Sequence, residues 1–449
     1  MTFAQMKLKS KTKKKATTTT TMALLWLPLA GVLVWSPAAH ALQPLDVFVR
    51  GAREHNPINH EAVANRAAAD ARADATFGRA LPGVSAAASY TRNQWDVSFG
   101  GLEVAPLNQV DAAVSLTVPL VDLAKFARIS AANRAAEAAA YREAATARES
   151  EAQAVQLYYQ LTADLALVDV ARKALDVVRV NLTLNEQAAR AGTVTPLDVQ
   201  RASVEVERQS QQLTSAELEV KLVARALASR TGVIADTTRG AQLEDDLRAE
   251  SPLDGFVADA PSTPAVRAAL SDRSEAERRA TAERLTLVPA LSGAVSERYT
   301  NAVGFLNGHH DAYTAVVSLV WGVDFTTAPS FRARDAEVDA ARAREEQAQV
   351  TAADSIFRAW STIDADIARC RSARVQATVA AHAADVARTR YRSGVGTQLE
   401  LIQADRDAFA AVAGRIQSDA DLLNARAQLR ILTGRFASPD PEPSPRSSR

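Results

Sequence analysis

The chain has 449 residues, enough for two or three ordinary domains, but only 5% are aromatic, which is little for a compact enzyme core. Basic and acidic residues number 52 each, and removing the six lysines of residues 1–41 leaves 46 basic residues and a net charge of −6. This acidic balance argues against a nucleic-acid partner. The single cysteine, Cys370, excludes an internal disulfide and a cysteine-rich metal site.

Residues 1–41 have the pattern of a signal peptide. Lys7–Lys15 is rich in lysine, Met22–Trp35 is apolar, and residues 39–41 (Ala-His-Ala) fit a cleavage site between small residues. The alternative is a single membrane anchor, although the apolar stretch is shorter than the ~20 residues that span a bilayer. The sequence leaves three possible start codons: Met1, Met6 and Met22.

Three helices are predicted in the first half of the chain. The first covers 54–81 and ends at Pro82. The second covers 122–191, which contains no proline or glycine, and has apolar residues at a 3-4 spacing that is typical of helices packed along their length. At 1.5 Å per residue this helix is roughly 100 Å long. The third covers 196–231.

The segment between the first helix and the long helix alternates with period two. Apolar residues alternate with smaller or polar ones in 84–91 and again in 110–118, which predicts a β-hairpin over 83–119. One apolar face per strand, with aromatic residues near the ends, is typical of a membrane-spanning barrel. A soluble antiparallel sheet packed on a core is the alternative.

The second half repeats this order. The sequence RAGTVTPLDVQRA at Arg190–Ala202 recurs as RSGVGTQLELIQA at Arg392–Ala404, 202 positions later. The chain is therefore predicted to contain two structural repeats, over 42–239 and 264–435. The remaining predicted segments are a linker (240–263), a helix (264–288), a β-hairpin (290–322), a long helix (331–391), a helix (398–433) and a disordered tail (436–449).

Four strands cannot close a barrel, and an open sheet edge is not tolerated in lipid. Transmembrane barrels start at about eight strands. The chain must therefore oligomerise if its strands span a membrane. A dimer would supply eight strands and a nearly filled interior, whereas a trimer would supply twelve and a water-filled lumen.

The chain resembles the TolC-like outer-membrane efflux protein family over 42–435. The resemblance lies in the order of these elements, the two glycine loops and the Thr-Gly ends at Gly232 and Gly434. The resemblance implies an α+β membrane protein. Three chains would form a 12-stranded outer-membrane β-barrel, continued by a long periplasmic α-helical coiled-coil barrel. Most of each chain would lie in the periplasm of a Gram-negative bacterium.

The function implied by this resemblance is that of a passive conduit, with no enzymatic activity, cofactor or metal. As the channel of a tripartite efflux system, it would receive small molecules from an inner-membrane pump (proton-driven or ATP-driven) and a periplasmic adaptor. One alternative is the channel of a type I protein secretion system. A second, from another class, is a periplasmic coiled-coil scaffold or adaptor.

The resemblance also implies a gate at the periplasmic tip, where the glycine loops lie. The family's two ring acids fall on Glu400 and Gln403, so one acid per chain remains. A family tyrosine that bonds an acid on the neighbouring hairpin maps to Tyr391, with Asp198 as its partner. A family arginine of the same latch falls on Gly396.

These acids have a second, compatible explanation in helix capping. Thr195 with Asp198, and Thr397 with Glu400, have the spacing of capping boxes. Each carboxylate would stabilise its helix start by roughly 0.5–2 kcal/mol. The turn glycines, which are predicted to adopt positive φ, are Gly192 and Gly394.

Overall fold

The structure is a computed structural model that describes residues 42–238 and 243–436. The predicted signal peptide lies outside these residues, as does the predicted tail except for Phe436. In the part of the chain that is described, no helix combines the length and apolar character that crossing a membrane requires.

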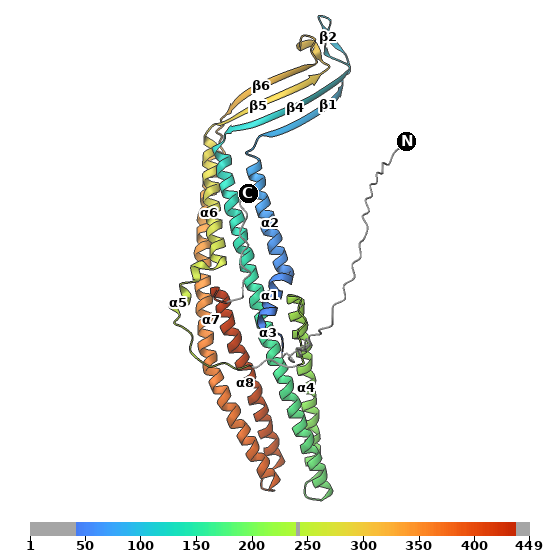
Figure 1. Ribbon diagram of the computed structural model, residues 1–449, viewed down its shortest axis with the longest axis vertical. Helices are drawn as coiled ribbons and strands as arrows, with labels where there is room; N and C mark the ends of the chain where they lie inside the picture. Colours follow the sequence, from blue (N-terminus) through green and yellow to red (C-terminus); the bar gives the residue numbers. More distant parts are fainter. Residues whose placement is uncertain (1–41, 239–242, 437–449) are drawn as a thin grey trace, which may run out of the picture. The chain divides into compact units, whose positions relative to one another are not determined.

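Two long helices run beside pairs of shorter ones (Figure 1). The helix α3 packs against α2 on one half of its length and against α4 on the other, and α7 packs in the same way against α6 and α8. The helices are α1 (Leu45–His55), α2 (Pro57–Gly78), α3 (Leu123–Arg190), α4 (Pro196–Thr231), α5 (Asp254–Val257), α6 (Pro264–Arg284), α7 (Thr327–Arg392) and α8 (Gln398–Thr433), with short 3-10 turns at Ala260–Ser262, Leu285–Leu287 and Val303–Phe305.

Proline explains where some helices differ from the prediction. The first predicted helix starts earlier and is broken in two, because Asn56 adopts an extended conformation before Pro57 and its side chain caps α2, with Asn56 Oδ1 accepting from Ile58 N at 3.1 Å. By contrast, α7 starts four residues before the predicted 331 and includes Pro329. Proline is tolerated there because the first turn of a helix has no partner for that N–H.

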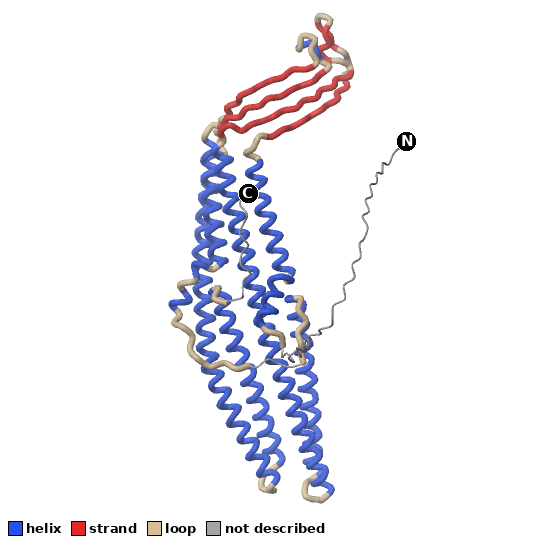
Figure 2. Tube along the Cα trace, viewed as in Figure 1, coloured by secondary structure: helices blue, strands red, loops and turns tan. Residues whose placement is uncertain are grey.

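The strands form one antiparallel sheet in the order β1-β4-β5-β6, at the end of the helices (Figure 2). The two predicted hairpins join through β4 and β5, with Val114 opposite Glu297. Consequently β1 and β6 each have one neighbouring strand among the described residues. The strands are β1 (Gly83–Arg92), β4 (Asn108–Val121), β5 (Ala290–Thr300) and β6 (Asp311–Val320), with a small separate hairpin of β2 (Val97–Phe99) and β3 (Leu102–Ala105).

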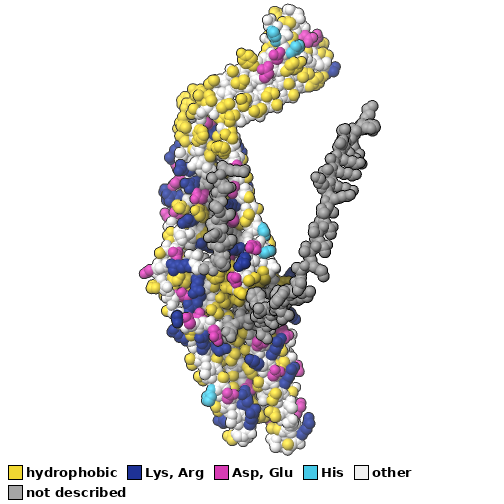
Figure 3. All heavy atoms as spheres, viewed as in Figure 1, with side chains coloured by type: hydrophobic (Ala, Val, Ile, Leu, Met, Phe, Trp, Pro, Cys, Tyr) yellow, Lys and Arg dark blue, Asp and Glu magenta, His cyan; other side chains and the backbone are white. Residues whose placement is uncertain are grey.

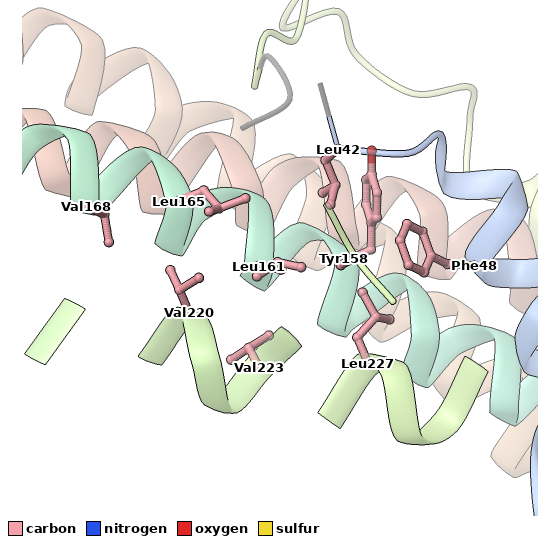
Figure 4. Close-up of a cluster of buried hydrophobic side chains, with 10 residues drawn as sticks. Leu42, Phe48, Tyr158, Leu161, Leu165, Val168, Val220, Val223 and Leu227 are labelled. Atoms are coloured by element: carbon pink, nitrogen blue, oxygen red, sulfur yellow. The ribbon is translucent and has the colours of Figure 1, made fainter. Parts of the chain in front are cut away.

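The hydrophobic core lies among the helices rather than beneath the sheet. In the close-up of Figure 4, Tyr158 of α3 lies beside Phe48 of α1, with Leu227 of α4 below them and Leu161 further along α3. A second cluster joins α5, α7 and α8 and includes the fully buried Cys370. Every residue of β1 is exposed. The sheet therefore has no core of its own within one chain.

Candidate gate at the helical tip

Two tight turns lie at the end of the helices opposite the strands (Figure 1). One joins α3 to α4 and the other joins α7 to α8. Gly192 has φ 74° and Gly394 has φ 77°, and a Cβ on either would meet nothing within 4 Å. The left-handed backbone is therefore what requires glycine at both turns, because L side chains rarely adopt it.

Both helices that follow these turns start with a capping box. Thr195 Oγ1 accepts from Asp198 N at 3.3 Å, while Asp198 Oδ2 accepts from Thr195 N at 3.3 Å. In α8, Thr397 Oγ1 accepts from Glu400 N at 3.2 Å, and Glu400 Oε2 accepts from Thr397 N at 3.4 Å. Each carboxylate is therefore engaged locally at a helix start.

Gly396 lies in a tight space and does not have a positive φ. Its N–H donates to Arg390 O at 3.0 Å, and a Cβ would lie 3.1 Å from Arg390 Cβ and 3.2 Å from Tyr391 N. The position onto which a family arginine maps is thus a close backbone contact, where a side chain would require its neighbours to shift by a few tenths of an ångström.

Tyr391 has a different partner from the predicted one. Its hydroxyl donates to Asn185 Oδ1 of α3 at 2.5 Å, so the predicted bond to Asp198 is not formed. The reason is that the Asp198 carboxylate accepts from Thr195 Oγ1 at 2.7 Å and lies 3.6 Å from Arg201. Burial, and then the negative charge of Asp198, raise the pKa of Tyr391, so this hydroxyl remains a hydrogen-bond donor.

A second contact joins the hairpins at the level of Asp198 itself. Gln398 Nε2 at the start of α8 donates to the backbone oxygen of Asp198 in α4 at 2.8 Å. Asn185 is 1% exposed and Gln398 is 6% exposed, so both polar side chains are buried between the hairpins. Buried polar groups are costly unless hydrogen-bonded, and separating the hairpins would remove these partners.

A charged contact between the hairpins lies further along the helices, at Glu205. This side chain of α4 is ion-paired with Arg406 of α8, whose Nε lies 3.1 Å from Glu205 Oε2. Arg208 and Gln209 donate to Glu205 Oε1 at 2.6 and 3.0 Å. Burial alone raises the pKa of Glu205, but hydrogen bonds from Arg406, Gln209 and Arg208 outweigh it, so the pKa lies below its usual value.

The prediction from sequence did not include Glu205, although a signal for it exists. Ala202, Glu205 and Gln209 are spaced by three and four residues, which is the spacing of one helix face, and all three are buried. A carboxylate on a buried face requires a cation or hydrogen-bond donors. The identity of that cation could not be read from the spacing, since Arg406 is 201 residues away.

Glu400 and Gln403 lie on one exposed face of α8. They line a groove with Gln376 and Val379 of α7, and Asp407 lines the same groove one turn beyond Gln403. The prediction from sequence also missed Asp407. This face therefore carries two acids seven residues apart, roughly 10 Å along the helix.

The fold defines a class of protein: two tandem repeats of helices, an antiparallel sheet with open edges at one end, and paired hairpin turns at the other. Residues 49–233 and 261–435 match the family described as "Outer membrane efflux protein". The chain belongs to this family, as the sequence predicts. The α+β fold class and the location in the outer membrane are likewise confirmed, and the family consists of channels for efflux rather than of enzymes.

Solved structures share the fold over most of the chain. A membrane protein from Pseudomonas aeruginosa is 20% identical with a TM-score of 0.75, and the match covers 87% of this chain and 93% of that one. The outer-membrane channel OprN is 21% identical with a TM-score of 0.75 (87% and 89% covered), and the CmeC outer membrane channel of Campylobacter jejuni is 15% identical with a TM-score of 0.76 (92% and 94% covered). No curated protein matches the sequence.

Proposed function

We propose that three copies of this chain assemble into a 12-stranded outer-membrane barrel continued by a helical tunnel in the periplasm. The open edges of β1 and β6 are the observation that carries this proposal. An edge strand presents unpaired N–H and C=O groups, which lipid does not tolerate. The order β1-β4-β5-β6 makes β6 of one copy antiparallel to β1 of the next, so that closure leaves no edge.

Disulfide trapping between the two edge strands tests this assembly. In a Cys370→Ser background, Ala86→Cys on β1 is combined in turn with cysteines at 313, 315, 317 and 319 on β6, which lie on the same face of the sheet as Ala86. We expect at least one pair to give a covalently closed trimer on a non-reducing gel. The matched control combines Ala86→Cys with Val295→Cys, which is on the same face but on the central strand β5. Dimers alone, or equal trapping with the control, would contradict the proposal.

The tip is proposed to be the gate of this tunnel. Tyr391 with Asn185, and Arg406 with Glu205, hold the two hairpins of one chain together. Separating the hairpins would require breaking these two contacts and the bond from Gln398 to Asp198, and hydrating the polar groups that they bury. The exposed acids of α8 face the groove rather than the neighbouring hairpin, which is compatible with a lining of the pore.

The proposed partners are a periplasmic adaptor and, through it, an inner-membrane pump that supplies the energy. Exposed apolar side chains at both turns support docking there: Leu197 is 52% exposed, Leu399 is 59% exposed and Val395 is 74% exposed. Chemical cross-linking in intact cells, followed by purification of the chain, should recover an adaptor. Leu197→Asp with Leu399→Asp should abolish that recovery while leaving the trimer intact.

A further inference from the structure

Large apolar side chains continue past the periplasmic end of β6. The strand ends at Val320, yet Trp321 is 65% exposed, Val323 is 58% exposed and Phe325 is fully exposed. The ring of Trp321 is fixed in place because Trp321 Nε1 donates to Leu287 O at 3.0 Å. An exposed tryptophan and phenylalanine where a strand leaves the membrane are typical of the membrane–water interface.

Aromatic residues also lie at two of the other strand–helix junctions. Phe77 near the end of α2 is 53% exposed, and Phe126 in the first turn of α3 is 60% exposed. Figure 3 shows hydrophobic side chains gathered over the strands and at the point where they meet the helices, with Lys and Arg side chains beyond. The apolar surface therefore ends at the first turns of the helices.

Three arginines lie within the first turns beyond this apolar edge. Arg79 follows α2, Arg128 is in the second turn of α3 and Arg332 is in the second turn of α7, and all three are exposed. None of the three forms an ion pair within the described residues. Their neighbours do, since Lys125 lies 3.4 Å from Asp122 and Arg284 lies 2.7 Å from Asp335.

The position of these arginines matches the depth of lipid headgroups. Arg128 and Arg332 lie five residues after the first residue of their helices, a rise of roughly 8 Å, and the headgroup layer adds about 5–8 Å to each side of the hydrocarbon core. Long arginine side chains also reach back towards the interface. By contrast, the two strand hairpins, 83–121 and 290–320, contain five acids and only two arginines.

We propose that Arg79, Arg128 and Arg332 bind the phosphate groups of anionic phospholipids in the periplasmic leaflet, beside the aromatic residues of the strand ends. Guanidinium groups suit this partner because they donate two parallel hydrogen bonds to phosphate oxygens. The inference rests on the proposed function, because it requires that the strands span the outer membrane.

Lipid selection by the full-length trimer tests the inference. The delipidated trimer is mixed with equal amounts of phosphatidylglycerol and phosphatidylcholine, and the lipids it retains are counted by native mass spectrometry. We expect phosphatidylglycerol to be favoured, and Arg79→Gln/Arg128→Gln/Arg332→Gln to reduce that preference by roughly fivefold for each arginine removed. The matched control, Arg179→Gln/Arg225→Gln/Arg415→Gln, changes exposed arginines far from the strands and should retain it.

Several outcomes would overturn the inference: equal retention of the two lipids, an equal loss in the control, or displacement of the lipid by free inorganic phosphate. Dissociation of the Gln variant into monomers would show that these arginines serve contacts between copies instead. A trimer that conducts ions but shows no lipid preference would refute only the lipid site. A chain that neither inserts nor conducts would refute the proposed function itself.

Tryptophan fluorescence provides an independent measurement of depth. Trp95→Phe with Trp360→Phe leaves Trp321 as the only tryptophan after residue 41. In vesicles that contain brominated phosphatidylglycerol, we expect strong quenching of Trp321, since bromine quenches only at close range. Unquenched emission from an inserted channel would refute a position in the lipid interface.

Discussion

Breaking two of the three described contacts between the hairpins should open the channel. The perturbation is Arg406→Gln combined with Tyr391→Phe, which removes the ion pair to Glu205 and the hydrogen bond to Asn185. Tyr391→Phe conserves side-chain size, Arg406→Gln shortens a partly exposed side chain, and both leave the capping boxes and the turn glycines in place. The helices should therefore fold as before.

The expected magnitude follows from burial. Breaking a fully buried ion pair costs about 3–5 kcal/mol. The Arg406 side chain is 43% exposed, and Glu205 keeps its bonds from Arg208 and Gln209, so about 1–2 kcal/mol is expected here. Loss of the Tyr391 hydrogen bond adds about 1 kcal/mol. The closed-to-open ratio should therefore fall roughly 30- to 150-fold, since every 1.4 kcal/mol is tenfold.

The assay is single-channel recording of the purified trimer in planar bilayers. We expect a modest rise in open probability for each single variant and a larger rise for the double variant. Arg415→Gln, an exposed position on the same helix, should behave as wild type. If the double variant conducts like wild type, the two contacts do not hold the tip closed and the proposed gate is wrong.

Three other properties of the helices can be measured. Burial, and then the charge of Glu219, raise the pKa of Asp164 from 3.8 to about 6, so the folded state binds a proton more tightly than the unfolded state and stability falls as pH rises from about 4 to about 6. In urea unfolding, Asp164→Asn should therefore increase the free energy of unfolding by about 1–2 kcal/mol at pH 7 and by almost nothing at pH 4, and a destabilised variant would refute this. Gly394→Ala should destabilise the tip by about 1–2 kcal/mol, because alanine rarely adopts the positive φ of Gly394. We expect faster amide hydrogen exchange in the turn, whereas unchanged exchange would show that the turn of the variant is not strained. Conductance block by divalent cations should be weak in the wild type, because the groove carries Glu400 and the more distant Asp407, and should disappear in Glu400→Gln; submicromolar block would contradict this arrangement.

The long helices are predictable because their signals are local. The structure has α3 at Leu123–Arg190, and the sequence predicts a helix over 122–191 from the absence of proline and glycine. Thr195 and Thr397 likewise define helix starts from four consecutive residues. Such features depend on neighbouring residues, which the sequence shows directly.

The contacts between the hairpins are not predictable in this way. The pairing of Tyr391 with Asn185 joins residues 206 positions apart and depends on how far each helix is rotated about its axis. A rotation by one residue turns a side chain by about 100°. The prediction therefore assigned Tyr391 a partner on the hairpin of α3 and α4, which is the correct hairpin, but chose Asp198 instead of Asn185. Asp198 is not the partner because its carboxylate caps its own helix.

The duplication explains the repeated turns and also shows where the repeats diverge. With the offset of 202 residues, Glu205 of the first repeat corresponds to Asp407 of the second. The first acid is 3% exposed and paired with Arg406, whereas the second is exposed in the groove of α7 and α8. Equivalent positions thus hold the same charge in opposite environments. A carboxylate that is buried against the other hairpin, as Glu205 is, resists separation of the hairpins, whereas the exposed Asp407 remains available to solvent and ions. The first repeat therefore supplies the acid that joins the hairpins, and the second repeat supplies the acid that lines the groove of α7 and α8.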